Sequence, residues 1–167
     1  MLILRVHWSA LLLVALTIPF TPPAHAQSTQ FYDASGRFTG SARESHGTMS
    51  FYDGKGRYTG SARTQYGTTQ FYDDRGWFSG SARESPTGST VYDSRGAYDG
   101  TARTNQGRTS FYDERGAYEG SASSNDNSTT FYDRNGRFEG RAQTSDGGSA
   151  ASPAWMQWRR PTEEKGR

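Results

Sequence analysis

The chain has 167 residues, a formal net charge of +2 and no cysteine, so disulfides cannot stabilise it and no strongly basic face points to nucleic acid. Beyond Ala26 there is no Leu or Ile, and Val91 is the single β-branched aliphatic residue. A core of interdigitating aliphatic side chains is therefore excluded there, and a folded state must depend on aromatic packing and backbone hydrogen bonds.

Residues 1–26 have the pattern of a cleavable signal peptide. Arg5 lies in a short start, residues 10–20 are apolar, and Ala24-His25-Ala26 has the small-x-small form that places a cut after Ala26. Prolines end the apolar run before it reaches the roughly 20 residues of a membrane-spanning helix. We therefore expect an exported protein, periplasmic or secreted, with no transmembrane segment after cleavage.

Residues 27–146 are read as six tandem copies of one 20-residue unit. Phe-Tyr-Asp occurs at 31–33, 51–53, 71–73, 111–113 and 131–133, and Val91-Tyr92-Asp93 takes its place in the fourth copy. The repeat framework consists of the Tyr of this triplet and of a Gly three residues after the Asp: Tyr32, Tyr52, Tyr72, Tyr92, Tyr112, Tyr132, Gly36, Gly56, Gly76, Gly96, Gly116 and Gly136. A period without one insertion indicates a repeat architecture.

Each unit is predicted to be a β-hairpin. In the second copy, strand-forming residues 48–53 lead into Asp53-Gly54-Lys55-Gly56, and residues 57–63 form the returning strand. Asp at the first position and a left-handed Gly suit a type I turn with a bulge. Because one hairpin is marginal in water, the units must stack. We expect an all-β fold in which the hairpins form a quasi-linear array or a β-solenoid, with a largely disordered chain as the alternative.

The hairpin register predicts two different faces. A three-residue loop pairs Tyr52 with Tyr58 and leaves Gly60 on the same face as these two rings. Phe51 then points to the opposite face, beside Thr59, where it is free to meet a ligand unless the units coil into a solenoid that buries it. The candidate ligand face consists of the Phe residues that precede the framework tyrosines: Phe31, Phe51, Phe71, Phe111 and Phe131.

The repeat pattern fades before residues 147–167, which we expect to be a flexible C-terminal tail. This tail combines Trp155 and Trp158 with Arg159 and Arg160. Two roles are open for it: it caps the last hairpin, or it is a docking peptide for a partner.

The segment Tyr52-Asp53-Gly54-Lys55-Gly56-Arg57 and its counterparts resemble the YD repeats of Rhs-type bacterial surface proteins, whose pattern is Tyr-Asp-x-x-Gly-Arg. Short exported bacterial proteins built from Phe-Tyr-Asp-x-x-Gly-Arg units are similar over residues 31 to about 143. This resemblance implies β-structure. The aromatics, Asp-x-x-Gly turns and later Gly are also similar to the choline- and glucan-binding cell-wall repeats, in which ligands lie on aromatic cages between units.

Few residues suggest catalysis. His46 lies in a link between units, where the other copies have unrelated residues, and the serines lack a His/Asp partner set. The six recurring aspartates, such as Asp53, start turns, where Asp accepts hydrogen bonds from its own backbone. We expect no enzyme, no catalytic residues, no cofactor and no metal site.

Binding by repetition is the expected activity. Aromatic rings beside arginines can stack on sugar faces, and an array multiplies weak contacts by avidity. We therefore expect a non-enzymatic binding or structural module of the cell envelope, with cell-wall glycan or another envelope protein as its partner and no nucleic acid. The alternatives are a partner-binding or assembly protein that acts through the Trp155/Trp158 tail, and a largely disordered envelope protein.

Overall fold

The structure is a computed structural model that describes residues 27–145. The secondary structure of these residues consists of twelve strands and the turns between them. The strands are β1 (Ser28–Asp33), β2 (Phe38–Ser45), β3 (Thr48–Asp53), β4 (Tyr58–Gln65), β5 (Thr68–Asp73), β6 (Phe78–Ser85), β7 (Gly88–Asp93), β8 (Tyr98–Asn105), β9 (Arg108–Tyr112), β10 (Tyr118–Ser124), β11 (Ser128–Asp133) and β12 (Phe138–Thr144).

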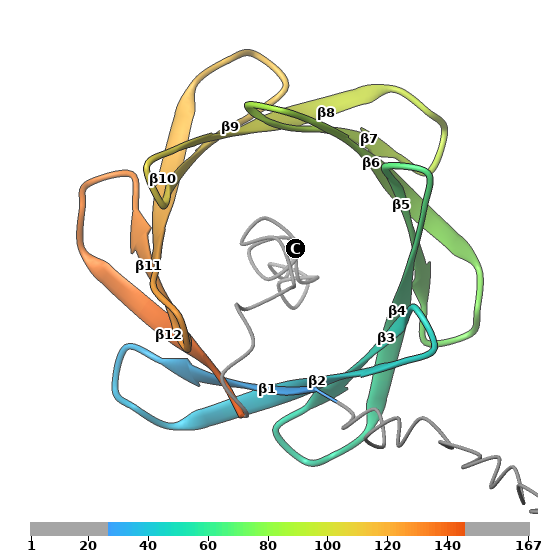
Figure 1. Cartoon of the computed structure of the whole chain (residues 1–167), viewed down its shortest axis with the longest axis vertical. Coiled ribbons are helices and arrows are strands. Elements are labelled where there is room, and N and C mark those ends of the chain that lie inside the picture. The colour runs from blue at the N-terminus through green and yellow to red at the C-terminus, as the bar shows by residue number, and fades with distance from the viewer. Residues whose placement is uncertain (1–26, 146–167) are drawn as a thin grey trace, which may run out of the picture.

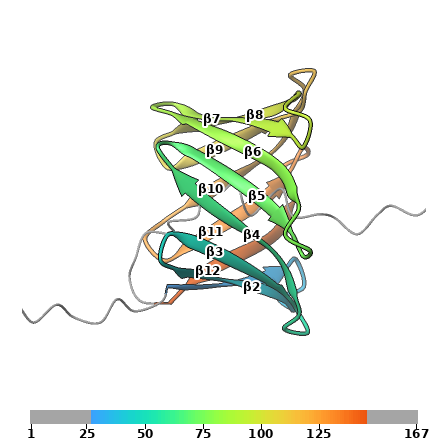
Figure 2. The same cartoon turned by 90° about the vertical axis from the view of Figure 1, so that its right-hand side faces the viewer.

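The twelve strands form one closed antiparallel barrel. Each strand pairs with its neighbours in the sequence, and β1 pairs with β12 to complete the ring. Figure 1 looks down the barrel and shows the strands as a closed circle. Figure 2 shows the barrel from the side, with its strands tilted and its turns gathered at the two ends. Each repeat contributes two adjacent strands, so the all-β hairpin prediction is confirmed.

The closing seam has the same register as the seams between consecutive repeats. Ala42 lies opposite Phe51 where the first repeat meets the second. Ala142 lies opposite Phe31 where the sixth repeat meets the first. The prediction of a quasi-linear array or a β-solenoid is therefore wrong. Closure satisfies the backbone groups of β1 and β12, which an open array would leave as exposed edges.

The stagger between repeats explains how six units close. Across the first hairpin Phe31 pairs with Gly40, and across the next seam Gly40 pairs with Asp53. Asp53 lies two residues beyond Phe51, the counterpart of Phe31. Each repeat therefore shifts the register by two residues, and six repeats shift it by as many residues as there are strands. An equal strand number and shear correspond to a strand tilt of about 36°.

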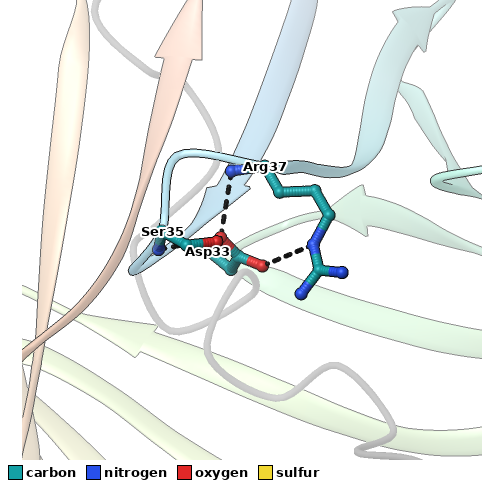
Figure 3. A network of polar contacts seen from close by, with 3 residues as sticks. All are labelled: Asp33, Ser35 and Arg37. Carbon is teal, nitrogen blue, oxygen red and sulfur yellow. Dashed lines mark hydrogen bonds and ion pairs between the residues drawn. The ribbon is translucent and has the colours of Figure 1, made fainter.

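The turns at one end of the barrel have the predicted geometry. Figure 3 shows the first of them, in which Asp33 Oδ1 accepts hydrogen bonds from the backbone N–H groups of Ser35 and Arg37 at 2.9 and 3.0 Å. The N–H of Gly36 donates to the carbonyl of Asp33 at 2.9 Å, and Gly36 has φ +79°. This is a turn that starts on Asp and needs a left-handed Gly. The same backbone bonds recur in all six repeats.

A β-bulge follows each turn and changes the predicted faces. In the second repeat Tyr52 pairs with Tyr58 as predicted, but Phe51 pairs with Gly60 because Thr59 is the extra residue. One extra residue moves every later side chain of the strand to the other face. The expectations that Gly60 shares the tyrosine face and that Phe51 lies beside Thr59 are therefore wrong.

The bulge places phenylalanines and alanines on one face, where they form the core. Around the barrel each Ala pairs with the Phe, or with Val91, of the following repeat. Phe111 is 1% exposed and Ala82 is fully buried. Side chains converge on the concave face of a closed sheet and diverge on its convex face. The more buried face is therefore the inner one, and its core is a ring of Phe, Val and Ala.

Two predicted segments lie outside the described residues: the signal peptide of residues 1–26 with its cut after Ala26, and the tail of residues 147–167 with Trp155 and Trp158. Within residues 27–145 no helix is long and apolar enough to cross a membrane.

Candidate binding sites on the outer face

The outer face of each repeat carries a pair of aromatic rings. The framework tyrosine at the end of the first strand meets the ring that starts the second strand, because the turn brings these two residues into register. The rings of Tyr52 and Tyr58 have centroids 6.1 Å apart and planes at 70°, which is an edge-to-face contact. The pairs Tyr32–Phe38, Tyr72–Phe78 and Tyr112–Tyr118 have nearly the same geometry.

The second ring of each pair is open to solvent in all six repeats. Its exposed fraction is between 38% and 44% in Phe38, Tyr58, Phe78, Tyr98, Tyr118 and Phe138. The framework tyrosines are half-buried. The similar exposure around the barrel gives six similar aromatic surfaces. A ring with one face in solvent can still stack on the apolar face of a ligand.

Arginines complete several of these sites from the neighbouring repeat. The Arg43 guanidinium carbon lies 5.6 Å from the centroid of the Tyr52 ring, and that of Arg103 lies 5.3 Å from Tyr112. Arg141 lies 5.4 Å from Tyr32 across the closing seam. These distances are those of cation–π contacts. Each such site therefore combines an arginine of one repeat with the aromatic pair of the next.

The tyrosine rings are also held by polar contacts within their own strand. The hydroxyl of Tyr32 donates to Gln30 Oε1 at 2.6 Å, and that of Tyr72 donates to Gln70 Oε1 at 3.0 Å. In these two repeats the tyrosine is fixed by a ring partner at one side and by an amide at its tip.

The phenylalanines predicted as the ligand face lie on the inner face. Phe31 is 3% exposed and Phe111 1%. Phe51, Phe71 and Phe131 are half-buried against the alanine ring. The exposure expected for this set is not found, because the bulge directs these rings to the concave face. The outward aromatics are instead the tyrosines and the rings that follow the turns.

The recurring aspartates stabilise the turns, as predicted. The Ser35 hydroxyl, which donates to Asp33 Oδ1 at 2.6 Å, and the backbone N–H of Arg37 lower the pKa of Asp33 from 3.8 to about 2. The backbone N–H and the guanidinium of Arg57 lower the pKa of Asp53 in the same way. Residues 27–145 contain no cluster of three or more His, Asp or Glu side chains that could hold a metal ion.

His46 lies in a tight turn between β2 and β3, with a left-handed φ of 50°. Its Nδ1 is 2.9 Å from the hydroxyl of Ser45, and both side chains are exposed. This pair belongs to a surface turn at the end of the barrel opposite to the Asp-x-x-Gly turns.

Sequence reasoning identified the aromatic pairs but not the arginines that cover them. For Arg43 and Arg103 the signal is the recurrent Ser-Ala-Arg or Thr-Ala-Arg after the second Gly of the unit, at 41–43, 61–63, 81–83 and 101–103. Arg141 instead stands where the other copies have Ser or Thr. That these arginines lie beside the tyrosines of the next repeat became clear only from the strand register between repeats.

No protein-family model, curated protein or solved structure matches the chain.

Proposed function

We propose that the protein is a non-enzymatic, exported binding module of the cell envelope that holds glycans by avidity. The observation that carries this proposal is that all six repeats pair two aromatic residues across the hairpin on the outer face, with the second ring open to solvent. Six similar surfaces on one rigid ring are suited to a polymer that presents the same chemical group many times. The export expected from residues 1–26 and the resemblance to YD and cell-wall repeats agree with this proposal.

The exposed ring is the part of the pair that meets the sugar. Phe78 is 42% exposed, and its edge-to-face partner Tyr72 is held by Gln70. Because Phe78 packs against a tyrosine that is itself held in place, its ring loses little conformational entropy on binding, and even a weak stacking contact contributes to affinity. A repeating polymer that reaches two or three neighbouring pairs multiplies such contacts, because the later ones are intramolecular.

The test is retention of the mature chain, from Gln27 onward, on insoluble peptidoglycan and on neutral polysaccharides. The variants Tyr58→Ala, Phe78→Ala and Tyr98→Ala remove neighbouring exposed rings singly and together. We expect the triple variant to lose far more retention than any single variant, because avidity is lost faster than contact area.

Tyr66→Ala is the matched control. Tyr66 is fully exposed in a turn between β4 and β5 and belongs to no aromatic pair, so its removal should leave retention unchanged. If the unsubstituted chain passes through every glycan, or if Tyr66→Ala weakens binding as much as Phe78→Ala, the proposal is wrong.

The alternative is a partner-binding or assembly protein that acts through Trp155 and Trp158. These tryptophans lie outside the described residues, and the alternative depends on their composition alone. A chain that ends at residue 146 separates the two functions, because it keeps all six aromatic pairs and should keep glycan retention.

A further inference from the structure

We propose that the glycan is acidic, with carboxylates that bind to a band of arginines on the outer face beside the aromatic pairs. This inference rests on the proposed function and names its ligand class. The arginine band consists of Arg43, Arg63, Arg83, Arg103, Arg108 and Arg141. All six are exposed and lie at outward-facing strand positions. Five of them lie between the tyrosines and the opposite end of the barrel, and Arg141 lies directly opposite Tyr32.

The charge of this band is not balanced on its own surface. Outward positions alternate along each strand, and in β3 they are Thr48, Ser50 and Tyr52, while in β4 they are Ser61, Arg63 and Gln65. The corresponding positions of the other ten strands contain Ser, Thr, Gln, Asn, Gly, Tyr or Arg, and no Asp or Glu. A chain with a net charge of only +2 thus presents six guanidinium groups and no carboxylate at these paired outward positions of its strands.

The acidic residues nearest to the aromatic pairs are Asp99, Glu119 and Glu139, which take the unpaired bulge position directly after the exposed ring in three repeats. Glu119 occupies a bulge position and lies in the field of Asp113 and Arg134. The turn aspartates are occupied by their own backbone, as Asp53 is by the N–H groups of Lys55 and Arg57. The polar groups of the turns are therefore not directed at the arginine band.

The position of the arginines relative to the rings indicates how one sugar unit would be bound. The guanidinium carbon of Arg103 lies 5.3 Å from the centroid of the Tyr112 ring, and a guanidinium held against a ring in this way still has N–H groups at its edge to donate. The fork of N–H donors matches a carboxylate, which accepts two parallel bonds. A sugar that stacks on Tyr118, which is 38% exposed beside Tyr112, would carry a carboxylate within reach of that edge.

The distribution of the arginines favours a glycan over a nucleic acid. The two residues Arg43 and Arg103 lie in the first and fourth repeats, and Arg141 lies in the sixth. Such an arrangement surrounds the barrel rather than following one groove, whereas single-stranded nucleic acids are usually held in a continuous basic groove. Separate sites suit a polymer network or a flexible chain that contacts neighbouring repeats.

The test compares two soluble polymers that differ only in charge: polygalacturonate and the same polymer with its carboxyl groups reduced to alcohols. We expect the mature chain to bind polygalacturonate at least about tenfold more tightly, and this preference to decrease as salt screens the charges. The triple variant Arg43→Gln, Arg103→Gln and Arg141→Gln should lose the preference while it keeps its binding to the neutral polymer and its β-sheet circular dichroism.

The matched control removes the same charge elsewhere. Arg75→Gln, Arg95→Gln and Arg115→Gln lie in the exposed turns and should leave the preference for polygalacturonate intact. Equal binding of the two polymers by the unsubstituted chain would refute the acidic ligand and leave the proposed function standing. Binding of neither polymer, together with no retention on insoluble glycans, would refute the proposed function itself. Equal loss in both triple variants, or single-stranded DNA bound as tightly as polygalacturonate, would show a general polyanion surface and also overturn the inference.

Discussion

Replacing Gly80 by Ala should open the seam between the third and fourth repeats. Gly80 in β6 pairs with Asp93 in β7 and has φ +150°. A Cβ atom at this position would lie 2.6 Å from the backbone carbonyl oxygen of Tyr92, whereas ordinary contact begins at 3.4 Å. Because the obstacle is backbone within a ladder, it cannot rotate away, and the two strands must separate.

The structure gives a magnitude for this change. An unfavourable backbone conformation costs about 1–3 kcal/mol, and forcing extra atoms into a packed site costs about 1–3 kcal/mol more. We expect Gly80→Ala to lower the free energy of unfolding by about 4 kcal/mol. Gly76→Ala is the matched control, because Gly76 has φ +82° but nothing within 4 Å of a built Cβ. It should cost only the left-handed strain, about 1–2 kcal/mol.

Urea unfolding of the mature chain, followed by circular dichroism, measures both values. The two glycines lie four residues apart, so the comparison separates the close approach of the seam from the conformational demand of the turn. A loss for Gly80→Ala no larger than that for Gly76→Ala would mean that the strands are not as close at this seam as the barrel requires.

Two further predictions concern the turns. The pKa of Asp33 is lowered from 3.8 to about 2, so its ionised carboxylate stabilises the fold fully above about pH 4, and this contribution is lost as the pH falls from about 4 to about 2. The pKa of Asp53 is lowered too, so Asp53 contributes stability in the same direction. Burial raises the pKa of Glu119, so Glu119 favours the folded state at lower pH instead. Asp33→Asn, which keeps an acceptor oxygen, should flatten the dependence of the urea midpoint on pH in that window, and an unchanged slope would contradict it. Tyr66 has a left-handed φ of 49° in a two-residue turn, where Asn is favoured. Tyr66→Asn should therefore stabilise the fold by about 0.5–1 kcal/mol in thermal unfolding, while Gln65→Asn in the adjoining strand should give no such gain.

The turn conformation and the pairing of the residues next to it were predictable from the sequence, because single residue types determine them. Asp53 and Gly56 indicate a turn with a left-handed Gly, and the pairing of Tyr52 with Tyr58 follows from the loop length. The bulge at Thr59 was not predictable in the same way, because an extra unpaired residue leaves no signal of its own in a polar strand. Its nearest sign is Gly60, since a Cβ there would collide with the carbonyl of Tyr72 in the next repeat.

The assignment of inner and outer faces depended on that single residue. With Thr59 paired, Phe51 would lie opposite a threonine and the tyrosines would face the small residues. With Thr59 unpaired, Phe51 lies opposite Gly60 and follows Ala62 into the core. A strand has a side-chain period of two, so an error of one residue exchanges the whole of each face. The candidate ligand residues were misplaced for this reason, although the aromatic pairs were correctly matched.

The closure of the sheet into a barrel was not predictable from the repeated sequence, because the residues of one unit determine only how it pairs with the next unit. The register shift of two residues per repeat decides how many units complete a ring, and this shift includes the bulge. The consequence for binding appears at the closing seam. Arg141 lies over Tyr32 although 109 positions separate them in the chain, and it reaches the ring from the strand position directly opposite. Arg43 reaches Tyr52 diagonally, from the position opposite Ser50. An open array would lack this site and would leave the first aromatic pair without an arginine. Closure therefore stabilises the sheet edges and supplies the first repeat with a neighbour, so the same contact that completes the fold also completes the ring of candidate sites.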